Sequence, residues 1–218
     1  MPLQYLTRRQ EFWSLDLHVD ERVLIPRPET ECLVEEVLRR AGSGPERWAD
    51  VGTGCGAVAL ALASERPDCS IVALDISSTA LEVAALNCRR HPRPGSQVRL
   101  VASDLLGALV ARRGALTRIA ANLPYLSSSE LPALAPEVAS HEPRLALVAG
   151  GRGEKMIARL LPQAAALLAA GGTLHLEIAP GLCSAVERLL RAEGLFSSFE
   201  VRRDLQGHAR VVSAVRKA

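Results

Sequence analysis

Apolar residues recur along the chain with two different periods. Short apolar runs are typical of strands, whereas apolar residues spaced three or four apart are typical of one face of a helix. The predicted strands are a segment that ends at Val51 and residues 70–74, 98–102, 118–121, 173–178, 199–202 and 210–215. The predicted helices are residues 32–40, 58–64, 79–90, 105–113, 155–169 and 183–193. Strands alternating with helices predict an α/β fold with a doubly wound, mostly parallel sheet, and the last two strands predict an antiparallel C-terminal addition.

Three segments lie outside this alternation. Residues 14–19 alternate as Ser-Leu-Asp-Leu-His-Val, which predicts a short strand or a hairpin arm. Residues 23–31 contain two prolines, which favour an extended path, and Glu29 or Thr30 can cap the helix that follows. This second segment is either a rigid linker or a wall of a ligand site. Residues 127–144 are rich in proline, and we expect a loop there.

A glycine-rich turn joins the first core strand to the first core helix, in the sequence Ala49-Asp50-Val51-Gly52-Thr53-Gly54-Cys55-Gly56-Ala57. Glycine has no Cβ, so this turn lets the backbone approach a ligand closely. The helix that follows offers free N–H groups and a partial positive charge. The next strand ends in Asp75, 19 residues after Gly56, near the roughly 20 at which nucleotide-binding βαβ units present a carboxylate to ribose. The combination predicts an adenosine-containing cofactor.

Polar groups follow the ends of the next strands as well. These are Asp104, after the third strand, and Asn122, after the fourth. In an open parallel sheet these ends border one crevice, so we expect both residues to converge with the glycine turn and Asp75. Asp75 suits ribose hydroxyls because it only accepts hydrogen bonds; Asp104 or nearby amides suit the exocyclic amine of adenine, with Leu105 against the base. Either acid alone could instead be a solvated loop residue or a helix cap.

The tetrad Asn122-Leu123-Pro124-Tyr125 places one of the seven aromatic residues of the chain after a strand-terminal Asn-x-Pro. The proline ring fixes φ and stiffens the turn, which aims the Asn122 side chain and the Leu123 carbonyl at one point. Two acceptors suit a planar –NH2 group, and Tyr125 can lie against the flat face of that group. The alternative is an ordinary turn with Tyr125 filling the core.

Composition narrows the class of protein. The chain has 218 residues, 48% of them hydrophobic, and its net charge of +2 offers no strong field for a nucleic acid. Its five cysteines lack C-x-x-C spacing, which argues against disulfides or a zinc site and favours a reducing compartment. No signal-peptide pattern opens the sequence, and its longest apolar run, residues 164–170, is too short to cross a bilayer. We expect a cytoplasmic protein with no metal and no membrane partner.

These motifs resemble those of S-adenosylmethionine-dependent amino methyltransferases, which combine Asp-x-Gly-x-Gly-x-Gly, the strand-terminal acid and Asn-x-Pro-Tyr. Four further segments narrow the resemblance to the release-factor glutamine N5-methyltransferases and extend it over nearly the whole chain. They are Phe12-Trp13-Ser14-Leu15, Ile25-Pro26-Arg27-Pro28-Glu29-Thr30-Glu31, Glu142-Pro143 and Arg203-Asp204…Gly207…Arg210-Val211. The resemblance implies a Rossmann-like class I methyltransferase sheet. It implies that residues 41–218 form the catalytic domain and that residues 1–40 pack on it, without the small helical domain that usually comes first in this family.

The resemblance also implies roles for single residues. The cofactor-binding residues, with Asp104 added from its strand-end position, are Gly52, Thr53, Gly54, Cys55, Gly56, Asp75, Asp104, Leu105 and Asn122. The residues that hold the acceptor are Asn122, Leu123, Pro124 and Tyr125. The acceptor is the glutamine of the Gly-Gly-Gln loop of peptide chain release factors, and S-adenosylmethionine becomes S-adenosylhomocysteine.

Three alternatives remain open. Leu123 stands where the family usually has proline, and Asn-Leu-Pro-Tyr also resembles the tetrad of ribosomal-RNA adenine dimethyltransferases, so an amino group of RNA or DNA is the alternative acceptor. The spacing Gly52-x-Gly54-x-x-Ala57 also fits the dinucleotide fingerprint of a nicotinamide-dependent oxidoreductase. The third alternative is a non-catalytic adenosine-binding or RNA-associated module. Such a module would need a stripe of basic residues, and a net charge of +2 does not require one.

Overall fold

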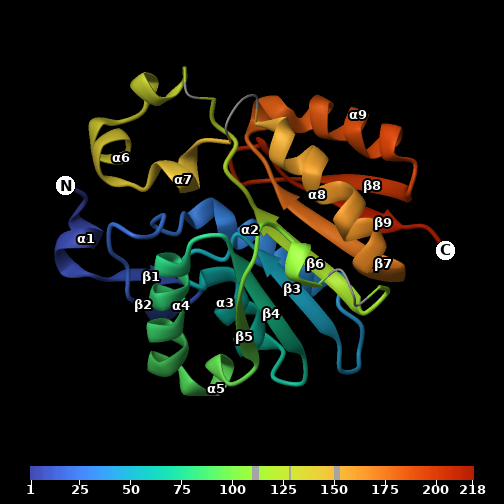
Figure 1. Cartoon of the computed structure of the whole chain (residues 1–218), viewed down its shortest axis with the longest axis horizontal. Coiled ribbons are helices and arrows are strands. Elements are labelled where there is room, and N and C mark those ends of the chain that lie inside the picture. Colours follow the sequence, from blue (N-terminus) through green and yellow to red (C-terminus); the bar gives the residue numbers. More distant parts are fainter. Residues whose placement is uncertain (110–112, 128, 150–152) are drawn as a thin grey trace.

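A computed structural model describes residues 1–109, 113–127, 129–149 and 153–218 of the chain. Its strands are β1 (Gln10–Phe12), β2 (Leu15–Leu17), β3 (Arg47–Val51), β4 (Ser70–Asp75), β5 (Val98–Ala102), β6 (Leu116–Asn122), β7 (Leu168–Glu177), β8 (Phe196–Arg203) and β9 (Ala209–Arg216). In the described residues, β3 to β9 form one sheet with the order β5-β4-β3-β6-β7-β9-β8, and β1 pairs with β2 in a separate hairpin (Figure 1). Strands β3 to β7 run parallel, and β9 runs antiparallel to both β7 and β8. The predicted doubly wound α/β sheet with an antiparallel C-terminal addition is confirmed.

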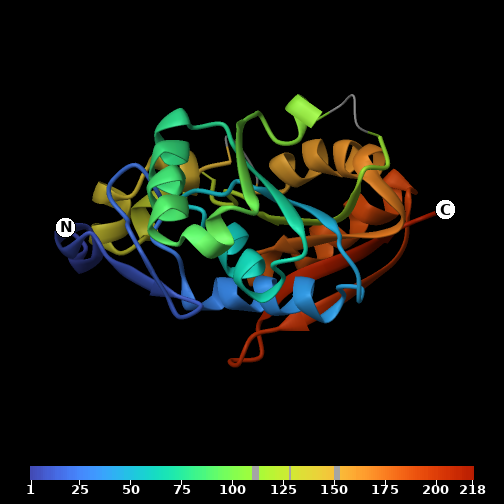
Figure 2. The same cartoon turned by 90° about the horizontal axis from the view of Figure 1, so that it is seen from below.

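Helices cover both faces of this sheet. The α-helices are α1 (Leu3–Thr7), α2 (Glu31–Arg39), α3 (Ala57–Glu65), α4 (Ser78–Arg90), α5 (Pro92–Gly95), α6 (Pro136–His141), α7 (Arg144–Leu147), α8 (Glu154–Leu167) and α9 (Cys183–Glu193). The 3-10 helices are η1 (Pro28–Thr30), η2 (Gly107–Leu109), η3 (Leu131–Ala133) and η4 (Pro180–Leu182). Figure 2 shows α2 on one side of the strands and α8 on the other. None of the helices in the described part of the chain is long and apolar enough to cross a membrane.

The core has two apolar clusters, one on each face of the sheet. Helix α3 belongs to the first cluster, and its residues 57–63 are all buried. A helix that is apolar all round must be covered on every side, and here the sheet and the β1–β2 hairpin share the cover, since Phe12 and Leu17 lie in the same cluster. Helices α8 and α9 supply the second cluster, with Leu160 and Val186 fully buried.

The N-terminal hairpin is tied to the sheet domain by polar contacts as well. The indole Nε1 of Trp13 donates to Glu65 Oε1 at 2.9 Å, and Arg90 Nη2 lies 2.6 Å from Asp16 Oδ2. Tyr5 donates through its hydroxyl to the Val23 carbonyl at 2.6 Å. The first two contacts join residues 1–40 to α3 and α4, whereas the third lies within residues 1–40.

Two predicted segments are wrong where the structure describes them. Residues 105–113 do not begin a helix: Leu105 has a φ of 51°, outside the right-handed helical region, and only the short η2 follows. The positions 110–112 of that prediction lie outside the described residues. Residues 127–144, predicted as a loop, contain η3 and α6, because proline is well tolerated in the first turn of each; residue 128 lies outside the described residues.

Two boundaries also differ from the expectation. Thr30 precedes α2 but makes no capping hydrogen bond, and its hydroxyl is used by Asn122 instead. Strand β7 begins at Leu168 rather than at residue 173, since the turn at Gly171, with a φ of 76°, stays within the strand opposite a register shift in β6.

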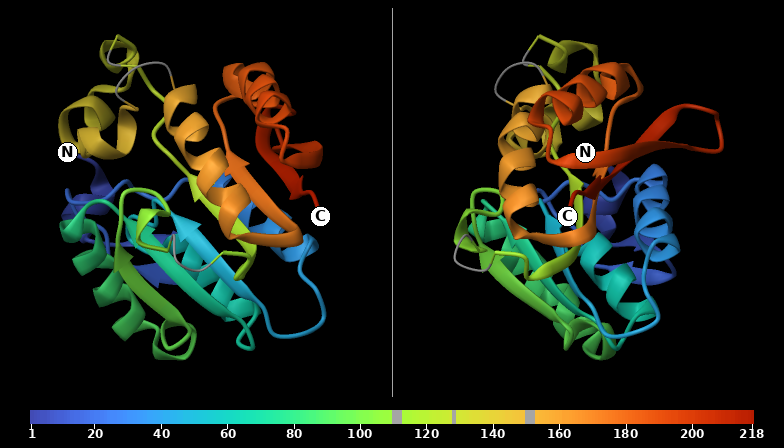
Figure 3. Two further views of the ribbon diagram at one scale, coloured as in Figure 1. Left: turned by 45° about the vertical axis from the view of Figure 1, so that its right-hand side comes forward. Right: turned by 90° about the vertical axis from the view of Figure 1, so that its right-hand side faces the viewer.

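The C-terminal pair β8–β9 forms a hairpin that projects beyond the rest of the molecule (Figure 3, right). Its tip is closed by Asp204, whose Oδ1 accepts from the amides of Gln206 and His208 at 3.0 and 2.9 Å. Arg210 Nη2 lies 2.9 Å from Asp204 Oδ2 and holds the carboxylate from the other strand. The tip exposes the apolar side chain of Leu205 beside the polar Gln206 and His208.

Candidate active site

A cavity of about 660 Å³ opens at the carboxyl ends of the parallel strands. Its volume lies within the roughly 300–1,000 Å³ of small-molecule sites. Gly52 and Gly54 line it from the turn after β3, Asp75 from the end of β4, Asp104 from the turn after β5, and Asn122 from the end of β6. The structure therefore brings together the polar groups of four successive strand ends.

The glycine turn presents bare backbone to this cavity. Gly52 has a φ of 77° and Gly54 a φ of 55°, a backbone region that favours glycine. A Cβ built on Gly54 meets nothing within 4 Å, so a side chain there would extend into open space beside the cavity. The amides of Gly52 and Thr53 both donate to the Leu74 carbonyl, at 2.8 and 3.0 Å, which fixes the turn to the end of β4.

Asp75 connects the turn to the next helix. Its Oδ2 accepts from the Gly54 amide and its Oδ1 from the Ser77 amide, both at 2.9 Å. The carboxylate is half-buried and lines the cavity. Ser77 in turn caps α4 by accepting from the Ala80 amide at 3.2 Å.

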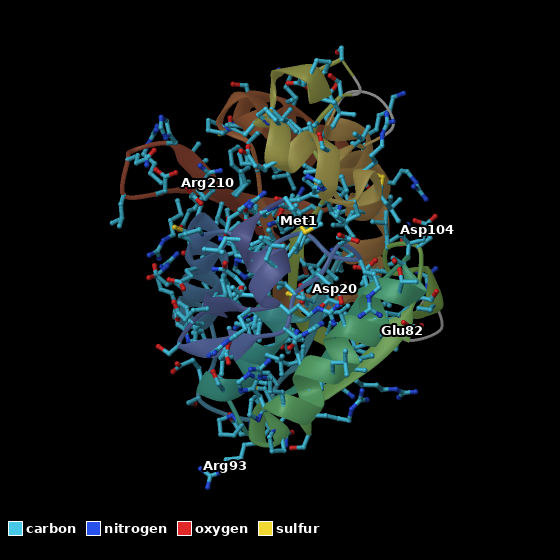
Figure 4. The ribbon with its side chains drawn as sticks, turned by 90° about the vertical axis from the view of Figure 1, so that its left-hand side faces the viewer. Met1, Asp20, Glu82, Arg93, Asp104 and Arg210 are labelled. Atoms are coloured by element: carbon cyan, nitrogen blue, oxygen red, sulfur yellow. The ribbon has the colours of Figure 1, made fainter. Side chains whose placement is uncertain are left out.

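Asp104 and Leu105 line the cavity next to Asp75, since the preceding Ser103 amide donates to the Asp75 carbonyl at 2.9 Å. Asp104 is exposed and its Oδ2 lies 2.6 Å from Arg159 Nη2 on α8, so this carboxylate is shared with an arginine that also lines the cavity. Leu105 is buried and contributes an apolar surface. Figure 4 labels Asp104 at the edge of the molecule, away from Arg210.

Four of the predicted site residues do not line the cavity, namely Thr53, Cys55, Gly56 and Tyr125. In the glycine turn, alternate residues face opposite ways: Gly52 and Gly54 face the cavity, whereas Thr53 and Cys55 are buried beneath it. Gly56 packs on α4, because a Cβ there would lie 3.4 Å from the Ala84 Cβ. Burial raises the pKa of the Cys55 thiol to about 12, so this cysteine is an uncharged packing group.

Two residues that the sequence analysis gave no role hold the turn from below. Asp50 is buried, and its Oδ2 accepts from the Thr53 hydroxyl at 2.6 Å and from the Ala59 amide at 3.2 Å; burial raises its pKa to about 6. Asn87 on α4 donates to the carbonyls of Cys55 and His18, both at 2.9 Å, and accepts from the His18 amide at 2.7 Å. The sequence could not indicate the role of Asn87, because its partner His18 lies 69 positions away. Asp50 could have been identified, because it belongs to the glycine-rich motif itself.

The tetrad begins at the cavity wall. Asn122 is half-buried, and its Nδ2 lies 3.3 Å from the Thr30 hydroxyl, which is buried between η1 and α2. This contact turns the amino group of Asn122 toward the protein and leaves its Oδ1 on the other side. Leu123 is buried and Pro124 half-buried, and both line the cavity.

A segment from the second half of the chain covers the tetrad. Residues 143–149, including the exposed Leu145, contribute to the cavity wall, and Leu126 pairs with Val148 in a short parallel bridge. The Leu126 amide donates to the Leu147 carbonyl at 3.1 Å, and the Ala149 amide donates back to the Leu126 carbonyl at 3.0 Å. The N-terminal region closes the other side, where residues 21–24 line the cavity. There Arg22 Nη2 lies 2.6 Å from Asp20 Oδ2, and Arg22 Nη1 lies 2.9 Å from Glu82 Oε2 on α4. Figure 4 labels Asp20 and Glu82.

Comparisons with known proteins agree with this geometry. A family model described as the methyltransferase small domain matches residues 28–151. The release factor glutamine methyltransferase of Moorella thermoacetica is 44% identical over 217 residues, which are 99% of this chain and 75% of that protein. That of Nitratidesulfovibrio vulgaris is 39% identical over 216 residues, 99% of this chain and 72% of that protein. The chain belongs to the release factor glutamine methyltransferase family.

A solved structure adds to this assignment. The release-factor-specific protein-(glutamine-N5) methyltransferase from Alicyclobacillus acidocaldarius is 26% identical to the chain, with a TM-score of 0.53, and the match covers 89% of this chain and 95% of that one. As a member of the release factor glutamine methyltransferase family, the chain is a methyltransferase, which sets aside the nicotinamide-dependent oxidoreductase and the non-catalytic module. In the part of the chain that the structure describes, no three His, Cys, Asp or Glu side chains gather where they could hold a metal ion.

Tyr125, the last residue of the tetrad, does not line the cavity and lies among charged groups. Burial raises the pKa of its hydroxyl, and the nearby carboxylate of Glu177 raises it further. Arg210 and Arg27 oppose this effect. Tyr125 thus stands between the cavity residues of the tetrad and a polar corner that β7, β9 and η1 form.

Proposed function

We propose that this protein transfers a methyl group from S-adenosylmethionine to the side-chain amide nitrogen (N5) of the glutamine in the Gly-Gly-Gln motif of a peptide chain release factor. The observation that carries the proposal is that one cavity is lined both by Gly52, Gly54 and Asp75 and by the first residues of the Asn122 tetrad. Groups suited to a nucleoside cofactor and groups suited to an amide acceptor therefore share one space. The names of the related proteins support the same acceptor.

The residues present fit S-adenosylmethionine. Gly54 offers a backbone surface on which a side chain would occupy ligand space, and Asp75 offers a carboxylate already oriented by two amides. Asp75 would hold the ribose hydroxyls, and Leu105 would pack on the adenine base, with Asp104 near the amine of the base. When bound, the cofactor supplies an electrophilic methyl group on a sulfonium centre.

The tetrad would hold the acceptor amide. An amide nitrogen is a poor nucleophile because its lone pair is delocalised into the carbonyl. Asn122 Oδ1 and the Leu123 carbonyl would each accept a hydrogen bond from one N–H group of the glutamine amide. These two hydrogen bonds would orient the nitrogen and favour a pyramidal geometry. Positioning of reacting groups lowers barriers by several kcal/mol, up to roughly 7–11 kcal/mol in ideal intramolecular models.

The remaining assignments follow from this reaction. The partner is a peptide chain release factor, so the reaction takes place in the cytoplasm, where translation ends. Residues 41–218 are the methyltransferase domain, and residues 1–40 are a segment packed on it, of which residues 21–24 form part of the cavity wall.

The test is methyl transfer from labelled S-adenosylmethionine to three acceptors: release factor, a release factor with glutamate in place of the Gly-Gly-Gln glutamine, and ribosomal RNA. We expect label in the first acceptor alone, because glutamate has no amide nitrogen. Label in the glutamate variant would contradict the site of transfer. Label in ribosomal RNA alone would favour the alternative, an adenine amino group, which the Asn-Leu-Pro-Tyr sequence keeps as the second candidate.

A further inference from the structure

Glu177, the last residue of β7, is a buried carboxylate for which the proposed chemistry has no direct use. The residue is 5% exposed. Its Oε2 is buried and has no hydrogen-bond partner among the described residues. A buried carboxylate with one free oxygen is costly to keep ionised, so its position next to the tetrad calls for an explanation.

The position of Glu177 is fixed by the sheet. In the parallel register of β6 and β7, Glu177 lies beside Asn122, so the two terminal residues of adjacent strands are neighbours. Asn122 and Thr30 face the Glu177 carboxylate, and as polar donors their side chains lower its pKa. Asn122 Nδ2 also lies 3.3 Å from the Thr30 hydroxyl. The amino group of Asn122 is thus directed to a corner whose acceptors are Thr30 and Glu177.

Charged groups from two other elements face the same carboxylate. Arg210 on β9 favours its ionised form, whereas Glu29 on η1 disfavours it, and the hydroxyl of Tyr125 lies nearby. Figure 4 labels Arg210 beside the β8–β9 hairpin, near the start of β9. Burial outweighs these contributions and raises the pKa of Glu177 to about 7.

We propose that Glu177 is a positioning residue: as a carboxylate it accepts from the Asn122–Thr30 pair and holds the Asn122 carboxamide with its Oδ1 toward the acceptor amide. An Asn side chain can rotate by 180° about its last bond, which exchanges its oxygen and its amino group. An ionised Glu177 accepts hydrogen bonds only, so it allows just one of these two orientations. The expected effect on methyl transfer rests on the proposed function, whereas the orientation of Asn122 by Glu177 does not.

Protonation of Glu177 should remove its preference for one orientation of the Asn122 carboxamide. A neutral carboxyl has an O–H that can donate to Asn122 Oδ1, so the exchanged orientation becomes favourable. Methyl transfer should therefore rise with pH as Glu177 loses its proton, with a midpoint near its pKa. In the variant Glu177→Gln this dependence should disappear, because an amide does not titrate.

The chain offers a direct spectroscopic test. Asn87 and Asn122 are its only two asparagines, so ¹⁵N-asparagine labelling yields two side-chain NH2 groups in a ¹H–¹⁵N spectrum. We expect the Asn122 signals to titrate with a midpoint near pH 7 in the wild type and to lose that midpoint in Glu177→Gln. The Asn87 signals serve as the internal reference, since Glu177→Gln should leave their pH response unchanged. Asn122 signals that respond identically in both proteins would overturn the proposal.

Kinetics supply the second readout. Single-turnover methyl transfer should fall about tenfold to a hundredfold in Glu177→Leu, which removes the acceptor, because small misplacements of reacting groups cost factors of this size. Cofactor affinity by calorimetry should stay within twofold. Glu177→Gln, which keeps an acceptor oxygen, should recover part of the rate. Glu187→Gln on α9 is the matched control and should behave as the wild type.

The two readouts separate the inference from the proposed function. If the wild type does not methylate release factor but the Asn122 signals titrate as expected, the proposed acceptor is wrong and the positioning of Asn122 stands. If release factor is methylated and the pH–rate profiles of wild type and Glu177→Gln coincide, the positioning role is overturned. Thr30→Val, which removes the hydroxyl of the same corner, should lower the rate in the same direction as Glu177→Leu.

Discussion

Arg27 Nη2 lies 2.5 Å from Glu142 Oε1, although 115 positions separate the two residues in the chain. The Glu142 side chain is 1% exposed, and its Oε2 has no hydrogen-bond partner among the described residues. Arg27 precedes η1, and Glu142 lies between α6 and α7. This ion pair therefore fastens the segment at residues 143–149, which lines the cavity, to the N-terminal region.

Replacing Arg27 should weaken the attachment of residues 143–149 to the N-terminal region. Arg27→Gln leaves the Glu142 carboxylate buried without its partner. We expect the free energy of unfolding to fall by about 1–2 kcal/mol, which is below the roughly 1.5–3 kcal/mol of a hydrogen bond to a charged group because Arg27 is partly exposed. S-adenosylmethionine affinity should also weaken, because the cavity wall at residues 143–149 is less fixed. Urea unfolding and calorimetry measure the two effects. Adding Glu142→Gln should restore at least half of the stability, and simple additivity of the two changes would contradict a coupled pair.

Asn87 should prove important for the glycine turn although it does not line the cavity. Asn87→Leu removes three hydrogen bonds and leaves the buried Cys55 carbonyl and two half-buried backbone groups of His18 without these partners. An unsatisfied buried group costs about 1–3 kcal/mol, so the loss of stability should reach at least about 2 kcal/mol, with weaker cofactor binding. Leu86→Ser, at an exposed position of the same helix, is the control and should change stability by about 0.5 kcal/mol or less. A normal unfolding midpoint for Asn87→Leu would show that the turn does not need this support.

Asp75→Asn should weaken S-adenosylmethionine by about 1.5–3 kcal/mol. The substitution is not conservative here, because both carboxylate oxygens accept from backbone amides, and the new NH2 group must face one of these donors. Asp104→Asn should cost less, since Asp104 is exposed and shared with Arg159. Calorimetric titration of the three proteins decides the order. Equal affinity in Asp75→Asn and wild type would remove Asp75 from the ribose site.

The sequence was most informative where one local pattern determines one structure. The glycine turn and the acids Asp75 and Asp104 could be placed at strand ends because apolar runs mark parallel strands and the ends of such strands meet at one edge. The antiparallel C-terminal pair followed from two adjacent alternating runs. The resemblance to the family then supplied the cofactor and the acceptor, which no periodicity contains.

What the sequence could not show depends on contacts between distant positions. The fastening of Arg27 to Glu142 and the contact of Thr30 with Asn122 join residues far apart in the chain. The left-handed conformation of Leu105 is unusual for a non-glycine residue, so its helical pattern was misleading. The buried carboxylate of Glu177 stood in an ordinary strand pattern, and only the register with β6 reveals its neighbour.

Stability should depend on pH through Glu177. Its pKa is about 7 in the folded chain against an ordinary 4.5, so the folded chain holds this proton more tightly than the unfolded chain. The favourable contribution is complete below about pH 4.5 and is lost as pH rises to 7, by about 3 kcal/mol in total. The difference in unfolding free energy between Glu177→Gln and wild type should therefore shift by about 3 kcal/mol in favour of the variant from pH 4.5 to pH 8.

Other buried groups do not obscure this comparison. Burial lowers the pKa of His175 to about 3, so that histidine favours folding at higher pH and its contribution is lost as pH falls below 6.5, the opposite sign. Asp50 contributes with the same sign as Glu177, since its pKa is raised to about 6. Both residues are present in wild type and in Glu177→Gln, so their effects cancel in the difference. Urea unfolding of both proteins at the two pH values is the measurement, and a constant difference would contradict the raised pKa of Glu177.

Asn122→Ala should abolish most of the activity and leave the cofactor bound. The change removes one of the two proposed acceptors of the glutamine amide, and loss of one such positioned group typically costs on the order of 10²–10³ in rate. S-adenosylmethionine should still bind measurably, because Gly54 and Asp75 are unchanged. Asn122→Asp should not restore the rate: it keeps an acceptor oxygen, but it places a second carboxylate beside the buried Glu177, where like charges repel. Single-turnover methyl transfer to release factor, with calorimetry for the cofactor, separates the two steps, and full activity in Asn122→Ala would remove Asn122 from the acceptor site.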